Sequence, residues 1–265
     1  MPSPTEMTVA QLSRLIGAPD APALVDVRID EDFDAHPYLI PTSIRCPFDR
    51  IETLAERLRG RRVVVICHRG RKLSQGAAAL LRAHGVQAET LAGGVVAWRE
   101  AGEIMVPAAR VTPGGLWVTR QRPKIDRIAC PWLIRRFVDP DARFLFVAPG
   151  EVLDVADRFG AFPFDVENTF WSHRGERCTF DVMIEEFNLG HPALARLADV
   201  VRGADTDRPE LAPQAAGLLA ISVGLSRLYR DDLAQLAAGL TVYDALYRWA
   251  RDGYEEGHDW PAAKT

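Results

Sequence analysis

The sequence predicts two domains: an α/β domain with a parallel sheet and flanking helices, followed by a mostly α-helical (α+β) domain. The chain has 265 residues, which exceeds the size of one small core and suits two domains. From about Thr8 to Ala108, short apolar runs alternate with helix-like segments, as is typical of a parallel sheet covered on both faces. Most of the remainder has helical patterning. We place the first domain at 6–106, an irregular linker rich in Pro and Gly at 107–115, and the second domain at 116–262.

The composition narrows the class of protein. Hydrophobic residues make up 48% and charged residues 26%, which is ordinary for a globular protein. The formal net charge of −4 argues against nucleic-acid binding driven by overall basicity, although it leaves a local basic face open. No apolar stretch reaches the roughly 20 residues that span a bilayer, so no membrane partner is expected. The first residues show no secretory signal, and the four cysteines have no CxxC spacing. We therefore expect a cytoplasmic protein with reduced thiols.

The elements of the first domain follow from local patterns. Runs of β-branched and apolar residues predict strands, and apolar residues three and four apart predict helices. The predicted strands are 23–28, 63–66 and 89–91, and the predicted helices are 9–16, 51–58, 75–83 and a segment beginning at 93.

Cys67 follows the strand Val63–Ile66 and precedes a basic loop that leads into a helix. Reactive groups in parallel sheets gather beyond the carboxyl ends of strands. The amides at the helix start and the side chains of Arg69, Arg71 and Lys72 would stabilise a thiolate there, and the thiolate is the nucleophilic form. A buried structural cysteine is the alternative.

The second domain is predicted to contain a little sheet and many helices. Strands are expected at 116–119 and 143–147. Helices are expected at 126–137 (with a late start or a kink at Pro131), 151–159, 179–187, 193–201, 214–225, 231–238 and 242–250. The segment 214–225 is apolar almost all round, which predicts a buried central helix.

The first hundred residues resemble a single rhodanese domain. The residues that carry the resemblance are Leu24–Arg28, Phe33, His36, Pro41, Cys67 with Gly70, and Leu91–Trp98. The resemblance implies a sulfurtransferase without a required cofactor, whose Cys takes a sulfane sulfur from a small donor such as thiosulfate, holds it as a persulfide and passes it to a thiol. Its catalytic loop would be Cys67, Arg69, Gly70, Arg71 and Lys72. Two positions depart from the family pattern: Lys72 and Leu73 stand where Arg and then Ser or Thr are usual, and Ser74 comes one residue later.

The second domain resembles the C-terminal domain of bacterial chromate-resistance proteins. The matching segments are Trp117–Arg120, Arg122–Phe137, His173–Glu176, Cys178–Asp181, Val201–Thr206 and Gly217–Ser222. The resemblance implies a link to chromate stress and does not imply a biochemical activity.

Two groups of polar residues in the second domain suit ligands. His173, Asp181, Glu185 and Asp205 could hold a divalent metal such as Zn, Fe or Mn, since Asp181 and Glu185 share a helix face; a solvated helix beside a loop histidine is the alternative. Arg122, Lys124, Arg127, Arg135 and Arg136 could bind chromate or another oxyanion, and nucleic-acid phosphate would suit them too; a solvated basic helix face is the alternative. Asp126 and Cys130, four residues apart, could face one pocket.

Three functions remain open from the sequence. The first is a cytoplasmic sulfurtransferase with a persulfide on Cys67, linked to chromate resistance through the second domain. The second is a chromate- or metal-responsive regulator in which the first domain senses redox state, although no helix-turn-helix is recognisable. The third is a metal-dependent enzyme in the second domain.

Overall fold

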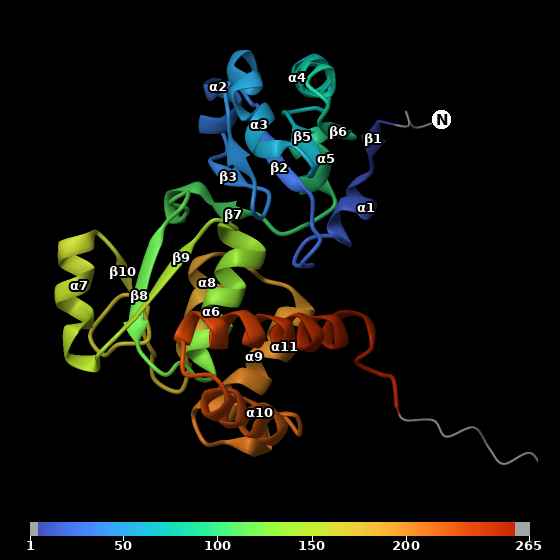
Figure 1. Ribbon diagram of the computed structural model, residues 1–265. Coiled ribbons are helices and arrows are strands. Elements are labelled where there is room, and N and C mark those ends of the chain that lie inside the picture. Colours follow the sequence, from blue (N-terminus) through green and yellow to red (C-terminus); the bar gives the residue numbers. More distant parts are fainter. Residues whose placement is uncertain (1–4, 258–265) are drawn as a thin grey trace, which may run out of the picture.

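The computed structural model describes residues 5–257 and shows a parallel sheet with flanking helices, followed by a helix-rich part with a small second sheet (Figure 1). This arrangement confirms the predicted fold class. The predicted end of the second domain at residue 262 lies outside the described residues. Within the described part of the chain, no helix combines the length and the apolar character needed to cross a membrane.

Five parallel strands form the first sheet, in the order β1-β6-β5-β2-β4. In chain order they are β1 (Glu6–Met7), β2 (Ala23–Asp26), β4 (Ile44–Arg45), β5 (Arg62–Ile66) and β6 (Gln87–Leu91). The helices around them are α1 (Val9–Ser13), α2 (Asp30–Asp34), η1 (Phe48–Leu54), α3 (Ala55–Leu58), α4 (Lys72–Ala83) and α5 (Gly94–Glu100). The central strand β5 is buried on both faces, since Val63 and Val65 pack into one apolar cluster and Val64 and Ile66 into another. Cys67 therefore emerges from the middle of the sheet.

The second sheet has three parallel strands in the order β10-β8-β9. These are β8 (Leu116–Arg120), β9 (Arg143–Val147) and β10 (Phe162–Pro163). The helices of this part are α6 (Asp126–Leu133), η3 (Ile134–Val138), η4 (Pro149–Glu151), α7 (Val152–Phe159), α8 (Thr179–Glu186), α9 (Pro192–Asp205), η5 (Pro209–Leu211), α10 (Ala215–Leu228) and α11 (Asp232–Asp252). Helix α7 packs against β8 with its own small apolar cluster, while α6, α8, α9 and α11 pack together on the other side (Figure 1).

The two parts share one apolar core. The short strands β3 (Tyr38–Leu39) and β7 (Val106–Pro107) pair antiparallel at the join, followed by η2 (Ala108–Arg110). The contact is tight at Gly17, where a Cβ atom would lie 2.5 Å from the ring of Phe137 and 2.7 Å from that of Tyr247. The Thr42 amide also donates to the carbonyl of Phe137 at 3.2 Å. The core buried by both parts predicts that they unfold together.

The helix predicted at 126–137 is present as α6, which begins at Asp126, and the π-helical turn η3, which follows it. Pro131 does not delay the start, and the regular α-helical pattern ends in the turn after it. The predicted pair of C-terminal helices is one helix, α11, of 21 residues. Gly239 lies inside this helix, where it faces Ile128 on α6. A Cβ atom at this position would come within 2.6 Å of the Ile128 side chain, so only glycine fits without a shift. This glycine permits close helix packing and does not break the helix.

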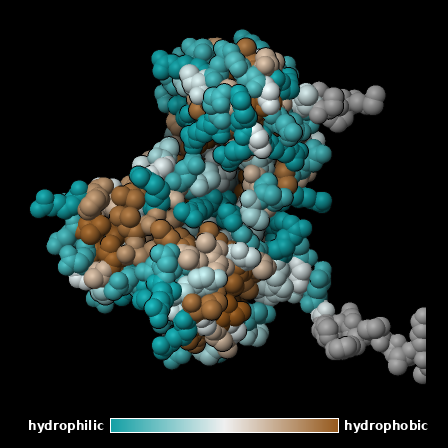
Figure 2. Space-filling view, viewed as in Figure 1, coloured by the Kyte–Doolittle hydropathy of each residue, from teal (hydrophilic) through white to brown (hydrophobic). Residues whose placement is uncertain are grey.

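The predicted burial of 214–225 is wrong. Helix α10 buries only Ala215, Leu218, Ser222 and Ser226, whereas Ile221 is 48% and Leu228 is 72% exposed. Figure 2 shows apolar side chains on the surface in the lower part of the molecule, where α10 lies beside α11. The helix packs against α9 and α11 with one face only. An apolar circumference cannot reveal how many neighbours a helix has, and this is why the pattern misled.

Candidate functional site

The Cys67 side chain lies at the carboxyl end of β5, directly before the turn into α4. It is buried, with 4% of its surface exposed. The Arg71 amide donates to Sγ at 3.3 Å, and Ser74 Oγ lies 3.2 Å from Sγ. Ser74 also donates to the Arg71 carbonyl. Helix α4 begins at Lys72, three residues earlier than predicted, and this brings Ser74 into its first turn beside the sulfur.

Two glycines hold the loop around Cys67 in its compact form. Gly70 has φ +65°, and a Cβ atom there would lie 2.4 Å from the Leu91 carbonyl. Gly94 has φ +61°, and a Cβ atom there would lie 2.2 Å from the carbonyl of Cys67. The Val95 amide then donates to that same carbonyl at 3.1 Å. The turn after β6 thus forms one wall of the loop, a role of Gly94 that its turn-like sequence context did not reveal.

Three cationic side chains surround this loop without partners. Arg69, Arg71 and Lys72 are exposed. Within residues 5–257 their side chains form no ion pair or hydrogen bond. Their charges and the N-terminus of the 12-residue helix α4 are therefore available to an anion that approaches Cys67.

The other cysteines lie in different environments. Burial raises the pKa of Cys46, and Asp49 raises it further. Burial also raises the pKa of Cys130 and Cys178 well above the usual range, and Asp126 adds to the effect for both thiols. These three thiols stay protonated near neutral pH, which makes them poor nucleophiles.

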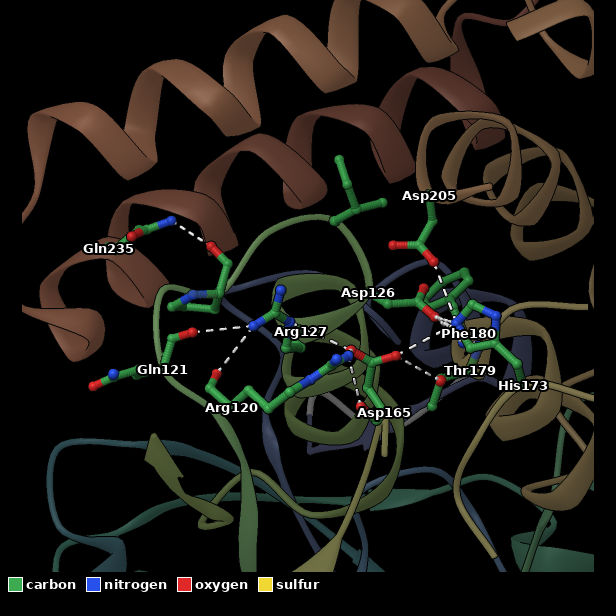
Figure 3. Close-up of polar contacts among 12 residues, drawn as sticks. Arg120, Gln121, Asp126, Arg127, Asp165, His173, Thr179, Phe180, Asp205 and Gln235 are labelled. Carbon is green, nitrogen blue, oxygen red and sulfur yellow. Dashed lines mark hydrogen bonds and ion pairs between the residues drawn. The ribbon is translucent and has the colours of Figure 1, made fainter. Parts of the chain in front are cut away.

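A second group of ionisable side chains meets in the second domain. His173 Nε2 lies 3.3 Å from Asp205 Oδ2, 3.4 Å from Asp165 Oδ1 and 3.5 Å from Asp126 Oδ2. Asp126 opens α6, Asp205 ends α9, and Asp165 and His173 come from the segment between β10 and α8. Figure 3 shows the imidazole and the three carboxylates pointing toward one another. We call these four residues the acidic cluster.

Asp126 is the most deeply buried member of the acidic cluster, with no exposed surface. Its Oδ2 accepts hydrogen bonds from the amides of Thr179 at 2.6 Å and Phe180 at 3.3 Å, in the first turn of α8. Its Oδ1 is buried and has no hydrogen-bond partner among the described residues. Burial raises the pKa of Asp126 to about 7, and the charges of Asp205 and Asp165 act in the same direction, against the opposing effect of His173.

Asp165 connects the acidic cluster to two arginines. Its Oδ2 lies 2.9 Å from the guanidinium of Arg120 and 3.3 Å from that of Arg127. Burial alone would raise the pKa of Asp165, but His173 and Arg120 outweigh it and hold the pKa below its usual value. The three carboxylates, Asp126 first, raise the pKa of His173 to about 12 despite its partial burial.

The structure brings only part of the predicted metal set together. His173 and Asp205 meet in the acidic cluster. Asp181 instead pairs with Arg202 at 2.8 Å and accepts from the Cys178 amide, so it caps α8. Glu185 is exposed and pairs with Arg177 at 2.6 Å. The prediction of Asp181 and Glu185 as ligands beside His173 is wrong, because their shared helix face pairs with arginines.

Asp126 and Asp165 were missing from the predicted metal set. Asp126 was noted only for its spacing from Cys130, and Asp165 follows the two-residue strand β10, which has no periodicity to detect. The signal that could have found them is their position beyond the carboxyl ends of two neighbouring parallel strands, since Asp165 follows β10 and Asp126 opens the helix that comes after β8.

The predicted anion-binding residues do not form one site. The Arg122 guanidinium donates hydrogen bonds to the carbonyls of Tyr229 and Ser226, and that of Arg135 donates to the carbonyl of Ala142. Arg136 forms a bidentate ion pair with Asp244. Arg127 donates to backbone carbonyls and pairs with Asp165. Lys124 is exposed, and within the described chain its side chain has no polar partner. Since four of the five cations already have acceptors, the predicted oxyanion site on these residues is not present as a unit.

Comparisons with known proteins match both parts of the chain. A family model described as "ChrB, C-terminal domain" matches residues 117–250, and one described as "Rhodanese-like domain" matches residues 8–101. Protein ChrB of Cupriavidus metallidurans is 36% identical over 135 residues, which cover 51% of this chain and 40% of that protein. The chain thus spans less than half the length of this relative.

Solved structures align with the first part. A rhodanese-related protein from Thermoplasma volcanium is 26% identical, with a TM-score of 0.33, over 38% of this chain and 96% of that one. A thiosulfate sulfurtransferase from Pseudomonas aeruginosa is 24% identical, with a TM-score of 0.34, over 39% of this chain and 19% of that one.

Proposed function

The chain belongs to the ChrB C-terminal domain family and carries a rhodanese-like domain before it, and we propose that it is a sulfurtransferase that holds a persulfide on Cys67. The observation that carries this proposal is the environment of the sulfur. Cys67 Sγ lies beside a loop amide and the first turn of α4, and the side chains of the three nearby cations have no ion-pair or hydrogen-bond partner in the part of the chain that the structure describes. An anionic donor and an anionic persulfide would both be stabilised by such surroundings.

The proposed reaction has two steps. The Cys67 thiolate attacks the sulfane sulfur of a donor such as thiosulfate; an S–S bond forms to Sγ, the bond to the sulfonate sulfur breaks, and sulfite leaves with the electron pair. A thiolate or cyanide then attacks the terminal sulfur, and Cys67 leaves as thiolate. Arg69, Arg71 and Lys72 would bind the donor and sulfite, and Gly70 and Gly94 would keep the loop folded around the sulfur.

The role of the second part is also a proposal. We place the protein in chromate resistance, in line with the family to which its second domain belongs. Thiols and persulfides reduce oxidants, so a persulfide enzyme could supply reduced sulfur during oxidant stress. The four free, buried cysteines suit a reducing compartment such as the cytoplasm.

The test is thiosulfate-to-cyanide sulfurtransfer by the purified full-length chain. Cys67→Ser is expected to lower turnover by on the order of 10³-fold or more, because serine cannot hold the transferred sulfur. Cys46→Ser is the matched control, since Cys46 is buried in the same apolar cluster and is expected to leave turnover unchanged. Mass spectrometry after exposure to thiosulfate should show one added sulfur atom on wild type and on Cys46→Ser. Equal turnover by wild type and Cys67→Ser, or none by wild type with any sulfur donor tried, contradicts the proposal.

A further inference from the structure

We propose that Asp126, His173 and Asp205 form a binding site for one divalent transition-metal ion, of which Zn²⁺ and Mn²⁺ are the best candidates. Each residue offers one ligand atom, and these atoms lie within 4.8 Å of one another. The site is separate from Cys67, whose apolar neighbours all come from the first part of the chain.

The spacing within the acidic cluster fits ligands around an ion better than it fits direct hydrogen bonds. Charge-assisted hydrogen bonds between nitrogen and a carboxylate are about 2.7–2.9 Å long. His173 Nε2 instead lies 3.3 Å from Asp205 and 3.5 Å from Asp126. A tetrahedral ion with metal–ligand bonds of about 2.0–2.1 Å separates its ligand atoms by about 3.3–3.4 Å. The imidazole nitrogen thus lies from each carboxylate at about the distance that separates two ligands of one ion, and all three ligand atoms lie within 4.8 Å of one another.

The unpartnered oxygen of Asp126 is independent support. Amides of α8 hold Oδ2, whereas Oδ1 is buried without a hydrogen-bond partner in the described chain. The two oxygens share one charge, so a cation bound at Oδ2, the oxygen that faces His173, would offset the desolvation cost of this buried carboxylate. No nearby cationic side chain other than His173 approaches Asp126 or Asp205 closely enough to form an ion pair among residues 5–257.

Asp165 contrasts with these two carboxylates. Arg120 and Arg127 both pair with its Oδ2, and Thr179 Oγ1 donates to its Oδ1 at 3.2 Å. Its charge is therefore already balanced by two guanidinium groups, and we do not count it among the ligands. When the imidazole gives up its proton to bind the ion, Asp126 and Asp205 carry two negative charges, which one divalent ion balances.

The ligand atoms of the site also indicate which metal ions would bind. One imidazole nitrogen and two carboxylate oxygens suit Zn²⁺ or Mn²⁺, and the lack of a thiolate disfavours Cu(I). Because the His173 side chain is 39% exposed, solvent can reach the site and supply the remaining ligands. Three protein ligands with an open position are characteristic of metal sites that bind a substrate or an activated water.

The experiment measures metal binding directly. The full-length chain, purified without a histidine tag and stripped with a chelator, is titrated calorimetrically with ZnCl₂, and Mn²⁺ binding is followed by electron paramagnetic resonance. We expect one ion per chain for wild type and at least about 100-fold weaker binding for His173→Gln and Asp205→Asn. Circular dichroism and the thermal midpoint of the metal-free variants establish that they are folded.

Three controls distinguish this site from other metal binding. Glu185→Gln removes an exposed acid, and His84→Gln removes an exposed histidine that pairs with Glu52; both should bind like wild type. Cys67→Ser should also bind like wild type. The proposal is overturned if wild type binds no ion, if His173→Gln and Asp205→Asn bind as tightly as wild type, or if only Cys67→Ser loses binding.

Discussion

The Cys67 loop and the acidic cluster both place charged side chains next to a buried polar group, but they differ in how the charges are brought there and in their sign. In the loop, residues close together in the sequence build the site, and its cations are exposed and have no ion-pair partner among residues 5–257. In the acidic cluster, residues spread from 126 to 205 meet through packing; Asp165 pairs with two arginines, whereas Asp126 and Asp205 share His173 as their ion-pair partner in the described chain. The loop is thus prepared to receive an anion, whereas the cluster has a surplus of carboxylates that calls for a cation.

The difference also concerns what holds each site together. The loop depends on the close approach of two backbone turns at Gly70 and Gly94. The acidic cluster depends on the first turn of α8 docking onto Asp126. Substitutions that disturb one should therefore leave the other intact, unless they act through the shared core.

The largest effect is expected for Gly94→Ala. The new Cβ would lie 2.2 Å from the carbonyl of Cys67 at φ +61°, so the loop must open. We expect a loss of about 2–4 kcal/mol in the free energy of unfolding and a loss of sulfurtransfer. Gly85→Ala is the control: it has φ +79° but open space around it, and should cost only about 1–2 kcal/mol and keep activity. Urea denaturation and the sulfurtransfer assay measure both; equal effects of the two substitutions would contradict the proposed role of the close approach.

Gly17→Ala tests whether the two regions are parts of one cooperative unit. Its Cβ would clash with Phe137 and Tyr247 at the contact between the two parts. We expect a loss of about 2–3 kcal/mol, with one calorimetric transition shifted as a whole. Gly60→Ala, with φ +75° and no atom within 4 Å, is the control and should cost about 1–2 kcal/mol. If wild type shows two separate transitions, and Gly17→Ala shifts only one of them, the two parts unfold independently.

A smaller effect separates the two acids of α8. Asp181→Asn weakens the pair with Arg202 and the cap on the Cys178 amide, both in a buried setting, and should cost about 1–3 kcal/mol. Glu185→Gln removes only an exposed pair with Arg177 and should cost less than about 0.5 kcal/mol. Chemical denaturation of the metal-free variants gives both values. A cost for Glu185→Gln as large as that for Asp181→Asn would mean that the exposed ion pair matters more than its surroundings indicate.

Much of the fold was predictable because its signals are local. The run Val63–Ile66 marked the central strand, and the alternation around it marked a parallel sheet. The exposure of α10 was not predictable, because an apolar helix has the same pattern whether one face or all faces are covered. The single helix α11 was missed because Gly239 resembles a break, and only its contact with Ile128 explains it.

The two sites likewise differ in whether their residues are close together in the sequence. The predicted residues of the Cys67 loop lie together because they fall within eight positions of the chain, apart from the turn at Gly94, and their catalytic role stays a prediction. Of the predicted metal ligands, the structure brings His173 and Asp205 together in the acidic cluster, and their role as ligands also stays a prediction. Helical spacing wrongly added Asp181 and Glu185, since sharing a face does not determine what that face packs against. Asp126 and Asp165 are brought to His173 by tertiary contacts that have no counterpart in local sequence.

The smallest predicted effect concerns the departure from the rhodanese pattern at Lys72. Lys72 is the first residue of α4, is exposed, and forms no ion pair within residues 5–257. An ammonium group binds an anion as a point charge, whereas a guanidinium group can donate two parallel hydrogen bonds to thiosulfate. Lys72→Arg should therefore raise kcat/KM for thiosulfate by about 3- to 10-fold, mainly through a lower KM, with the free energy of unfolding unchanged within about 0.5 kcal/mol. Lys124→Arg, the same change at an exposed lysine of the second part, should leave kcat/KM unaltered. If Lys72→Arg lowers kcat/KM instead, the loop is adapted to a donor other than thiosulfate, and repeating the assay with an organic persulfide as donor would identify that preference.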